Sequence, residues 1–64
     1  MTSDSIMARR DAYRRAYTAY LSCVRALSNT IVQGERPSQE LLDKERDSFE
    51  EVAAARAALL AELR

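Results

Sequence analysis

The sequence lacks histidine and tryptophan, and it contains only one cysteine, one glycine and one proline among its 64 residues. Cys23 therefore has no second cysteine in the chain for a disulfide, and one thiol without histidine cannot form a Cys/His zinc site. The missing histidine also excludes a Ser-His-Asp triad, and the single glycine excludes a glycine-rich phosphate loop. We therefore expect no catalytic residues, no metal, no cofactor and no enzymatic activity.

Long apolar segments are also missing, since no stretch approaches the roughly 20 apolar residues of a membrane span. The N-terminal stretch MTSDSIMARRDAY has no apolar run behind its charges, so we expect neither a signal peptide nor contact with a membrane. An unpaired Cys23 without an export signal is typical of a reducing compartment. We therefore predict a cytoplasmic protein in which Cys23 is a small core residue.

The residues that are present favour helix, because alanine, leucine, arginine and glutamate are abundant. The only helix breakers stand together in VQGERPSQE, where Gly34 suits a helix C-terminus, Pro37 prevents continuation and Ser38 suits a new N-cap. So short a connection predicts an antiparallel hairpin. The sequence thus predicts a single all-α domain over residues 1–64, with one helix at about 4–32, a turn at 33–38 and a second helix at about 39–63.

Apolar and aromatic residues recur at alternating steps of four and three in the first predicted helix, which is typical of coiled-coil packing. This row consists of Ile6, Arg10, Tyr13, Tyr17, Tyr20, Val24, Leu27 and Ile31. The second helix carries a broader apolar face made of Leu41, Leu42, Phe49, Val52, Ala53, Leu59, Leu60 and Leu63. Folding the hairpin about its turn places Tyr20 opposite Phe49.

Two helices cannot cover apolar faces of this width. We expect Met7, Leu21, Val32 and one member of each leucine pair to stay exposed. A chain of this length also buries too little surface to be stable without a staple. Since a disulfide and a metal are excluded, we expect a homodimeric four-helix bundle, with a hetero-complex or a larger assembly as the alternative. The residues predicted to form its dimer and core seam are Tyr20, Val24, Leu27, Ile31, Leu42, Phe49, Val52, Leu59, Leu60 and Leu63.

Charge is distributed unevenly along a chain whose formal net charge is zero. Residues 1–32 carry five arginines against two aspartates, a net charge of +3, and residues 33–64 carry five basic against eight acidic residues, a net charge of −3. Two hairpins with their turns at opposite ends would bring unlike charges together, so we expect this arrangement. The acidic residues Glu40, Asp43, Asp47 and Glu50 are interpreted as a solvated face.

A basic and aromatic patch is the candidate site for a protein partner, because such patches are typical of interaction hot spots. The residues we predict to bind a partner are Arg10, Tyr13, Arg14 and Tyr17. This favours a small protein–protein interaction module, such as an adaptor, an inhibitor or an assembly factor. The same residue types also bind nucleic acid, which leaves RNA binding as an alternative.

Two resemblances bear on the alternatives. In size and hairpin architecture the predicted fold resembles the plasmid copy-control RNA-binding Rop family, which implies a dimeric bundle that binds RNA through its first helix; no residue carries over. The stretch SQELLD, from Ser38 to Asp43, is similar to the S-Q-E-L-D motif of small helical-hairpin phosphatases that act on sporulation response regulators, which leaves a small phosphatase-like regulator of response regulators as a second alternative. An extra leucine here moves Asp43 one position on, which turns its side chain by about 100° around the helix.

Overall fold

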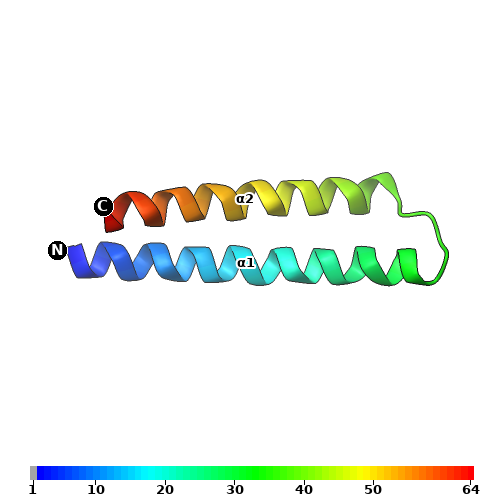
Figure 1. Ribbon diagram of the computed structural model, residues 1–64, viewed down its shortest axis with the longest axis horizontal. Coiled ribbons are helices and arrows are strands. Elements are labelled where there is room, and N and C mark those ends of the chain that lie inside the picture. Colours follow the sequence, from blue (N-terminus) through cyan, green and yellow to red (C-terminus); the bar gives the residue numbers. More distant parts are fainter. Residues whose placement is uncertain (1) are drawn as a thin grey trace.

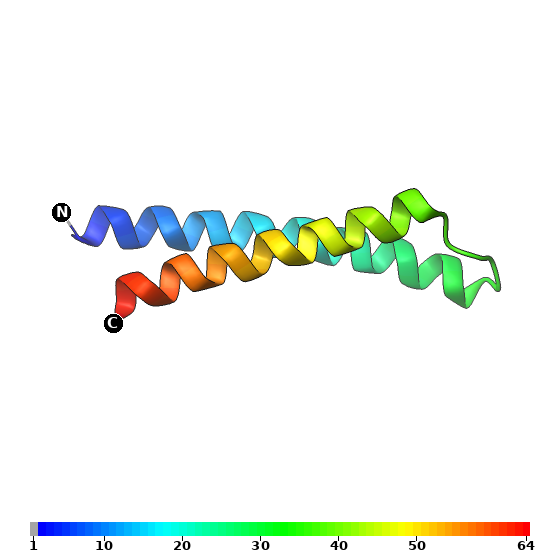
Figure 2. The same cartoon turned by 90° about the horizontal axis from the view of Figure 1, so that it is seen from above.

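Two α-helices form an antiparallel hairpin in the computed structural model, which describes the backbone of residues 2–64 and the side chains of residues 4–64 (Figure 1). Helix α1 spans Thr2–Val32 and helix α2 spans Gln39–Leu63. The two chain ends lie together at the end opposite the turn, and the helices cross when seen from above (Figure 2). The prediction of an all-helical fold with two packed helices is confirmed.

The turn between the helices is a Schellman motif centred on Gly34. The Gly34 N–H donates to the Ile31 carbonyl at 3.0 Å, and the Glu35 N–H donates to the Thr30 carbonyl at 3.0 Å. These bonds satisfy carbonyls at the end of α1 that have no partner within the helix. Gly34 adopts φ of 75°, in the left-handed region. Ser38 then caps α2, since its hydroxyl oxygen accepts from the Leu41 N–H at 3.1 Å.

Replacing Gly34 by alanine is expected to destabilise the fold by about 1 kcal/mol, because an L-residue is strained at positive φ. A Cβ at this position would meet no atom within 4 Å, so backbone strain alone accounts for the loss. The urea midpoint measures the effect, with Gln33→Ala as the control at a neighbouring position of ordinary backbone geometry. An unchanged midpoint for Gly34→Ala would contradict the assignment of the turn.

Most of the half-buried residues form one row on each helix, which we call the inner stripe. Its spacing of three and four residues is that of antiparallel helices packed along their length. The inner stripe consists of Ile6, Tyr13, Ala16, Tyr20, Cys23, Leu27 and Thr30 on α1, and Leu41, Glu45, Ser48, Val52, Ala55, Leu59 and Glu62 on α2. At its centre the Cys23 sulfur lies 3.4 Å from the Ser48 hydroxyl oxygen.

The hairpin has no fully buried residue among residues 4–64. Its accessible surface is 5095 Å², whereas a compact monomer of its 7.2 kDa mass would expose roughly 4,100 Å². The predicted exposure of Met7, Leu21 and Val32 is confirmed, as is that of Leu42 and Leu60 from the two leucine pairs. Much apolar surface is therefore left uncovered when the two helices pack only against each other.

Candidate interaction surface

A second stripe runs beside the inner stripe on each helix, one residue further along the chain. One residue turns a helix by about 100°, and because the helices run in opposite directions this step turns both stripes toward the same side of the hairpin. We call this side the Phe49 face. It consists of Met7, Arg10, Arg14, Tyr17, Leu21, Val24, Ser28 and Ile31 on α1, and Leu42, Arg46, Phe49, Ala53, Arg56, Leu60 and Leu63 on α2.

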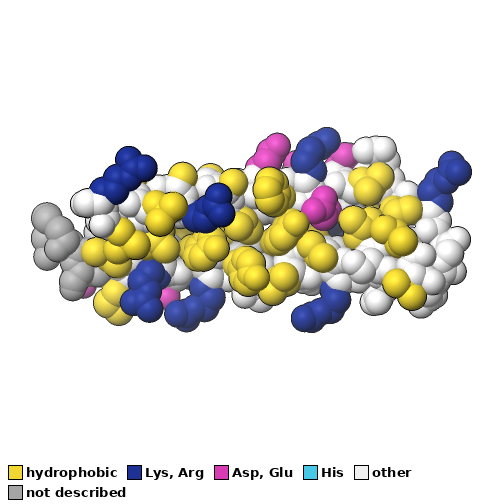
Figure 3. All heavy atoms as spheres, viewed as in Figure 1, with side chains coloured by type: hydrophobic (Ala, Val, Ile, Leu, Met, Phe, Trp, Pro, Cys, Tyr) yellow, Lys and Arg dark blue, Asp and Glu magenta, His cyan; other side chains and the backbone are white. Residues whose placement is uncertain are grey.

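The Phe49 face is exposed and mostly apolar. All of its residues are exposed except the half-buried Val24, and the large side chains of Phe49, Leu60 and Ile31 are exposed to 54%, 49% and 57%. Figure 3 shows hydrophobic side chains gathered along the length of one side of the hairpin, over both helices. Exposed apolar side chains gathered on one side in this way make that side a candidate interaction surface.

The charged residues of the Phe49 face are all arginines, with no acidic residue among them. Arg14 lies 4.0 Å from Asp11, which stands outside this face. Arg46 lies 3.4 Å from Asp43, also outside it. Such exposed pairs contribute little to stability. A partner that covers this face must therefore supply both apolar surface and negative charge.

The arginines are concentrated at the end of the hairpin that holds the chain termini. Tyr20 packs against Phe49 with ring centroids 5.7 Å apart, so these two residues lie at one level of the hairpin. Because the helices are antiparallel, moving back from Tyr20 along α1 and forward from Phe49 along α2 by the same number of residues reaches the same height along the hairpin. Arg56 therefore lies level with Tyr13. Arg10, Arg14 and Arg56 therefore share the terminal half of the face.

The four residues predicted to bind a partner lie close together on α1. Arg10, Arg14 and Tyr17 belong to the Phe49 face, and Tyr13 lies beside them on the inner stripe. The Tyr13 and Tyr17 ring centroids are 6.1 Å apart. A shallow hollow of about 110 Å³ beside them is lined by Met7, Arg10, Asp11 and Arg14. This is smaller than the roughly 300 Å³ of the smallest usual ligand pockets, so the patch suits a macromolecular surface better than a small molecule.

The residues of the predicted seam divide between two surfaces. Tyr20, Leu27, Val52 and Leu59 lie on the inner stripe, whereas Val24, Ile31, Leu42, Phe49, Leu60 and Leu63 lie on the Phe49 face. Small or polar residues complete the inner stripe where the sequence pattern indicated none, namely Ala16, Thr30, Glu45, Ser48 and Glu62. Bulk alone does not reveal such positions, because close approach of two helices requires small side chains between them.

Glu45 is an acidic residue of the inner stripe, and its carboxylate interacts with Tyr20. Desolvation raises the pKa of the Tyr20 hydroxyl, and the negative charge of Glu45 raises that pKa further. Glu45 lies four residues before Phe49 on α2, which places it level with Val24 near the turn half of the Phe49 face.

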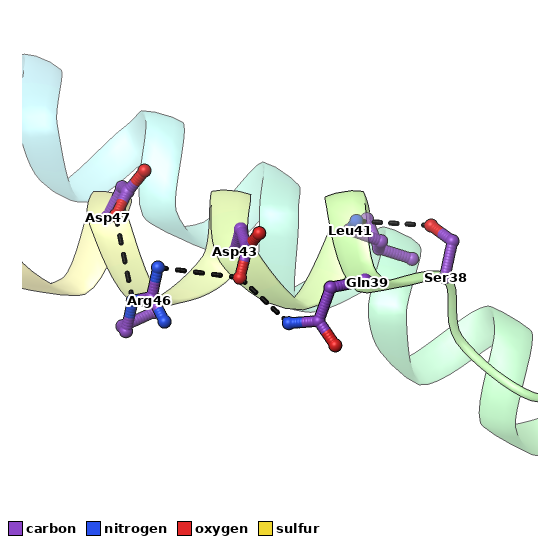
Figure 4. A network of polar contacts seen from close by, with 6 residues as sticks. All are labelled: Ser38, Gln39, Leu41, Asp43, Arg46 and Asp47. Carbon is purple, nitrogen blue, oxygen red and sulfur yellow. Dashed lines mark hydrogen bonds and ion pairs between the residues drawn. The ribbon is translucent and has the colours of Figure 1, made fainter.

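The SQELLD segment at the start of α2 forms a polar network of its own (Figure 4). Gln39 donates from Nε2 to Asp43 Oδ1 at 2.9 Å, and Arg46 Nη2 lies 3.4 Å from the same oxygen. Arg46 Nε also lies 3.7 Å from Asp47 Oδ1. Ser38 and Asp43 therefore act here as helix cap and ion-pair partner, which are structural roles.

The described residues form neither a metal site nor a membrane-spanning helix. No cluster of three or more cysteine, aspartate or glutamate residues is placed to hold a metal ion within that part of the chain. Neither of its helices is long and apolar enough to cross a membrane. Comparison of the chain with protein-family models, curated proteins and solved structures finds no match.

Proposed function

We propose that this chain is a small, non-enzymatic protein–protein interaction module that works as a homodimeric four-helix bundle. The observation that carries the proposal is the Phe49 face, which is apolar along both helices of a hairpin without a buried residue among residues 4–64. Packing two such faces together would cover the side chains that one hairpin leaves exposed. The bundle then serves as an adaptor, an inhibitor or an assembly factor for another protein.

The size of the Phe49 face suits a stable interface. The hairpin measures 50 by 15 Å along its two longer axes. A face of these dimensions is comparable to the roughly 800 Å² that each partner contributes to an interface of standard size. A second copy is the simplest occupant, because a twofold axis brings together two apolar faces of identical length.

The predicted partner-binding residues bear on what else this face can bind. Arg10, Arg14 and Tyr17 lie on the Phe49 face, so a second copy and a different protein would compete for them. In the homodimer these residues become part of the interface, and the partner protein binds the assembled bundle. A cytoplasmic location belongs to the same proposal, because the single thiol of Cys23 fits a reducing compartment.

Sedimentation equilibrium over a hundredfold range of protein concentration, at low and at high salt, tests the proposal. The expected result is a species of twice the 7.2 kDa chain mass that persists at high salt, because apolar contacts are not screened. A helical monomer at every concentration would contradict the homodimer. A chain that is unfolded when alone would instead indicate an obligate complex with a different protein.

RNA binding remains the second candidate function, because Arg10, Arg14 and Arg56 share one half of the Phe49 face with Tyr17. Cationic groups beside an aromatic ring can contact phosphates and stack on a base. Titration with an RNA hairpin at about 50 and 200 mM salt separates the candidates, since phosphate contacts are lost steeply as salt rises. Salt-sensitive RNA binding that disappears in Arg14→Gln would favour this candidate over the protein module.

A further inference from the structure

Two hairpins can pack through their Phe49 faces in two symmetric ways, with the turns at the same end or at opposite ends. With the turns at the same end, each residue faces residues of the second copy that lie at the same height along the hairpin. Arg10, Arg14 and Arg56 of both copies would then lie together, and the Phe49 face supplies no acidic residue to neutralise them. Burying like charges opposite one another is unfavourable, so this arrangement is disfavoured.

With the turns at opposite ends, the arginine half of one face covers the turn half of the other. Helix α1 spans Thr2–Val32, so a twofold axis through the middle of the hairpin passes near Tyr17. Arg10 lies about 10 Å from Tyr17 toward the termini, at the rise of roughly 1.5 Å per residue. The level that faces Arg10 lies equally far toward the turn in the second copy, which is the level of Val24.

Glu45 stands at this level. It lies on the inner stripe at the border of the Phe49 face, where it is half-buried. The ion pairs of Arg46 are with Asp43 and Asp47. Glu45 is therefore positioned to receive a cation from outside the hairpin.

Resting on the homodimer argued above, we propose that the two copies pack with their turns at opposite ends and that Arg10 of each pairs with Glu45 of the other. The twofold axis generates this pair twice in one dimer. The aliphatic part of each Arg10 side chain would cover Val24 of the second copy while its guanidinium reaches the carboxylate.

The proposal is tested with the dissociation constants of wild type, Arg10→Glu, Glu45→Arg and the double variant, measured by sedimentation equilibrium. Each single variant is expected to weaken the dimer about a hundredfold, because it places like charges together at two symmetric sites. The double variant restores the pair in reverse and should recover to within about tenfold of wild type. Arg15→Glu is the matched control, since it changes the net charge equally at an exposed position outside the Phe49 face.

The alternative arrangement, with both turns at the same end, predicts the opposite effect of Arg10→Glu on the dissociation constant. If the turns lay at the same end, Arg10→Glu would relieve repulsion among arginines and strengthen the dimer, which would overturn the proposal, as would an unchanged dissociation constant. If Glu45→Arg unfolds the hairpin, the charge reversal is replaced by Arg10→Gln, Glu45→Gln and the variant that combines them. Additive effects of the two single changes on the dissociation constant would then also overturn the Arg10–Glu45 pair. A wild-type monomer would instead refute the homodimer itself, so the two failures are distinguishable.

Discussion

Replacing Phe49 by glutamate is expected to dissociate the proposed homodimer, raising its dissociation constant about a thousandfold. Phe49 is exposed to 54% in the hairpin, and packing against a second copy would remove most of this ring surface from water. Losing that burial and placing a carboxylate in an apolar interface costs about 2 kcal/mol per site. The twofold axis doubles the cost to about 4 kcal/mol, which corresponds to the thousandfold change.

A matched control separates this effect from a change in charge or in helix content. Ala54→Glu adds one negative charge to α2 at an exposed position outside both the inner stripe and the Phe49 face. Alanine and glutamate both favour helix, so this variant should keep the wild-type dissociation constant. Circular dichroism reports whether each variant is still helical, and sedimentation equilibrium reports the mass. A Phe49→Glu chain that dimerises as wild type does would show that the Phe49 face is not the interface.

The unfolding temperature of the wild-type chain is expected to fall by about 10 °C when the protein is diluted a hundredfold. Dilution favours the unfolded monomer when folding and association are coupled, by about 2.7 kcal/mol for this range. Unfolding a dimer of two 64-residue chains requires roughly 90 kcal/mol of enthalpy. The ratio of the dilution free energy to this enthalpy sets the size of the change in unfolding temperature. Thermal scans followed by circular dichroism at both concentrations measure it.

Ultracentrifugation at the two concentrations shows whether dissociation accompanies the shift. An unfolding temperature that does not depend on concentration would mean that the hairpin folds and persists without a partner. That outcome would be unexpected for a chain whose described side chains include none that is fully buried. The free energy of folding depends on how much apolar surface is buried. In this hairpin most of the large apolar side chains that remain exposed lie on the Phe49 face, where only a partner can bury them.

The two packed helices could be predicted from the sequence because their signals are local. Gly34, Pro37 and Ser38 each act through the backbone geometry of a few neighbouring residues. The structure accordingly has Gly34 at positive φ and Ser38 as the N-cap of α2. Predicting the fold class required no knowledge of how closely the helices approach each other.

Which residues of α1 face α2 could not be predicted in the same way. The sequence pattern placed Tyr17 and Ile31 in the seam, whereas in the structure Ala16 and Thr30 lie on the inner stripe one position earlier. Neighbouring stripes differ by about 100° of helix rotation and share one period, so periodicity does not separate them. Glu45 shares the spacing of the inner stripe, but its acidic side chain gives no apolar signal in the sequence, and its half-burial in the structure places it there.

The sparse burial within each hairpin bears on how long the protein survives in a cell. Proteases act on the unfolded chain, and the unfolded fraction of a chain that folds as it associates grows as the chain becomes scarce. Newly made copies would be degraded until enough of them accumulate to find one another, and they would then be protected. The turnover of this protein would therefore depend on its own abundance, which sets a threshold in expression below which little of it persists.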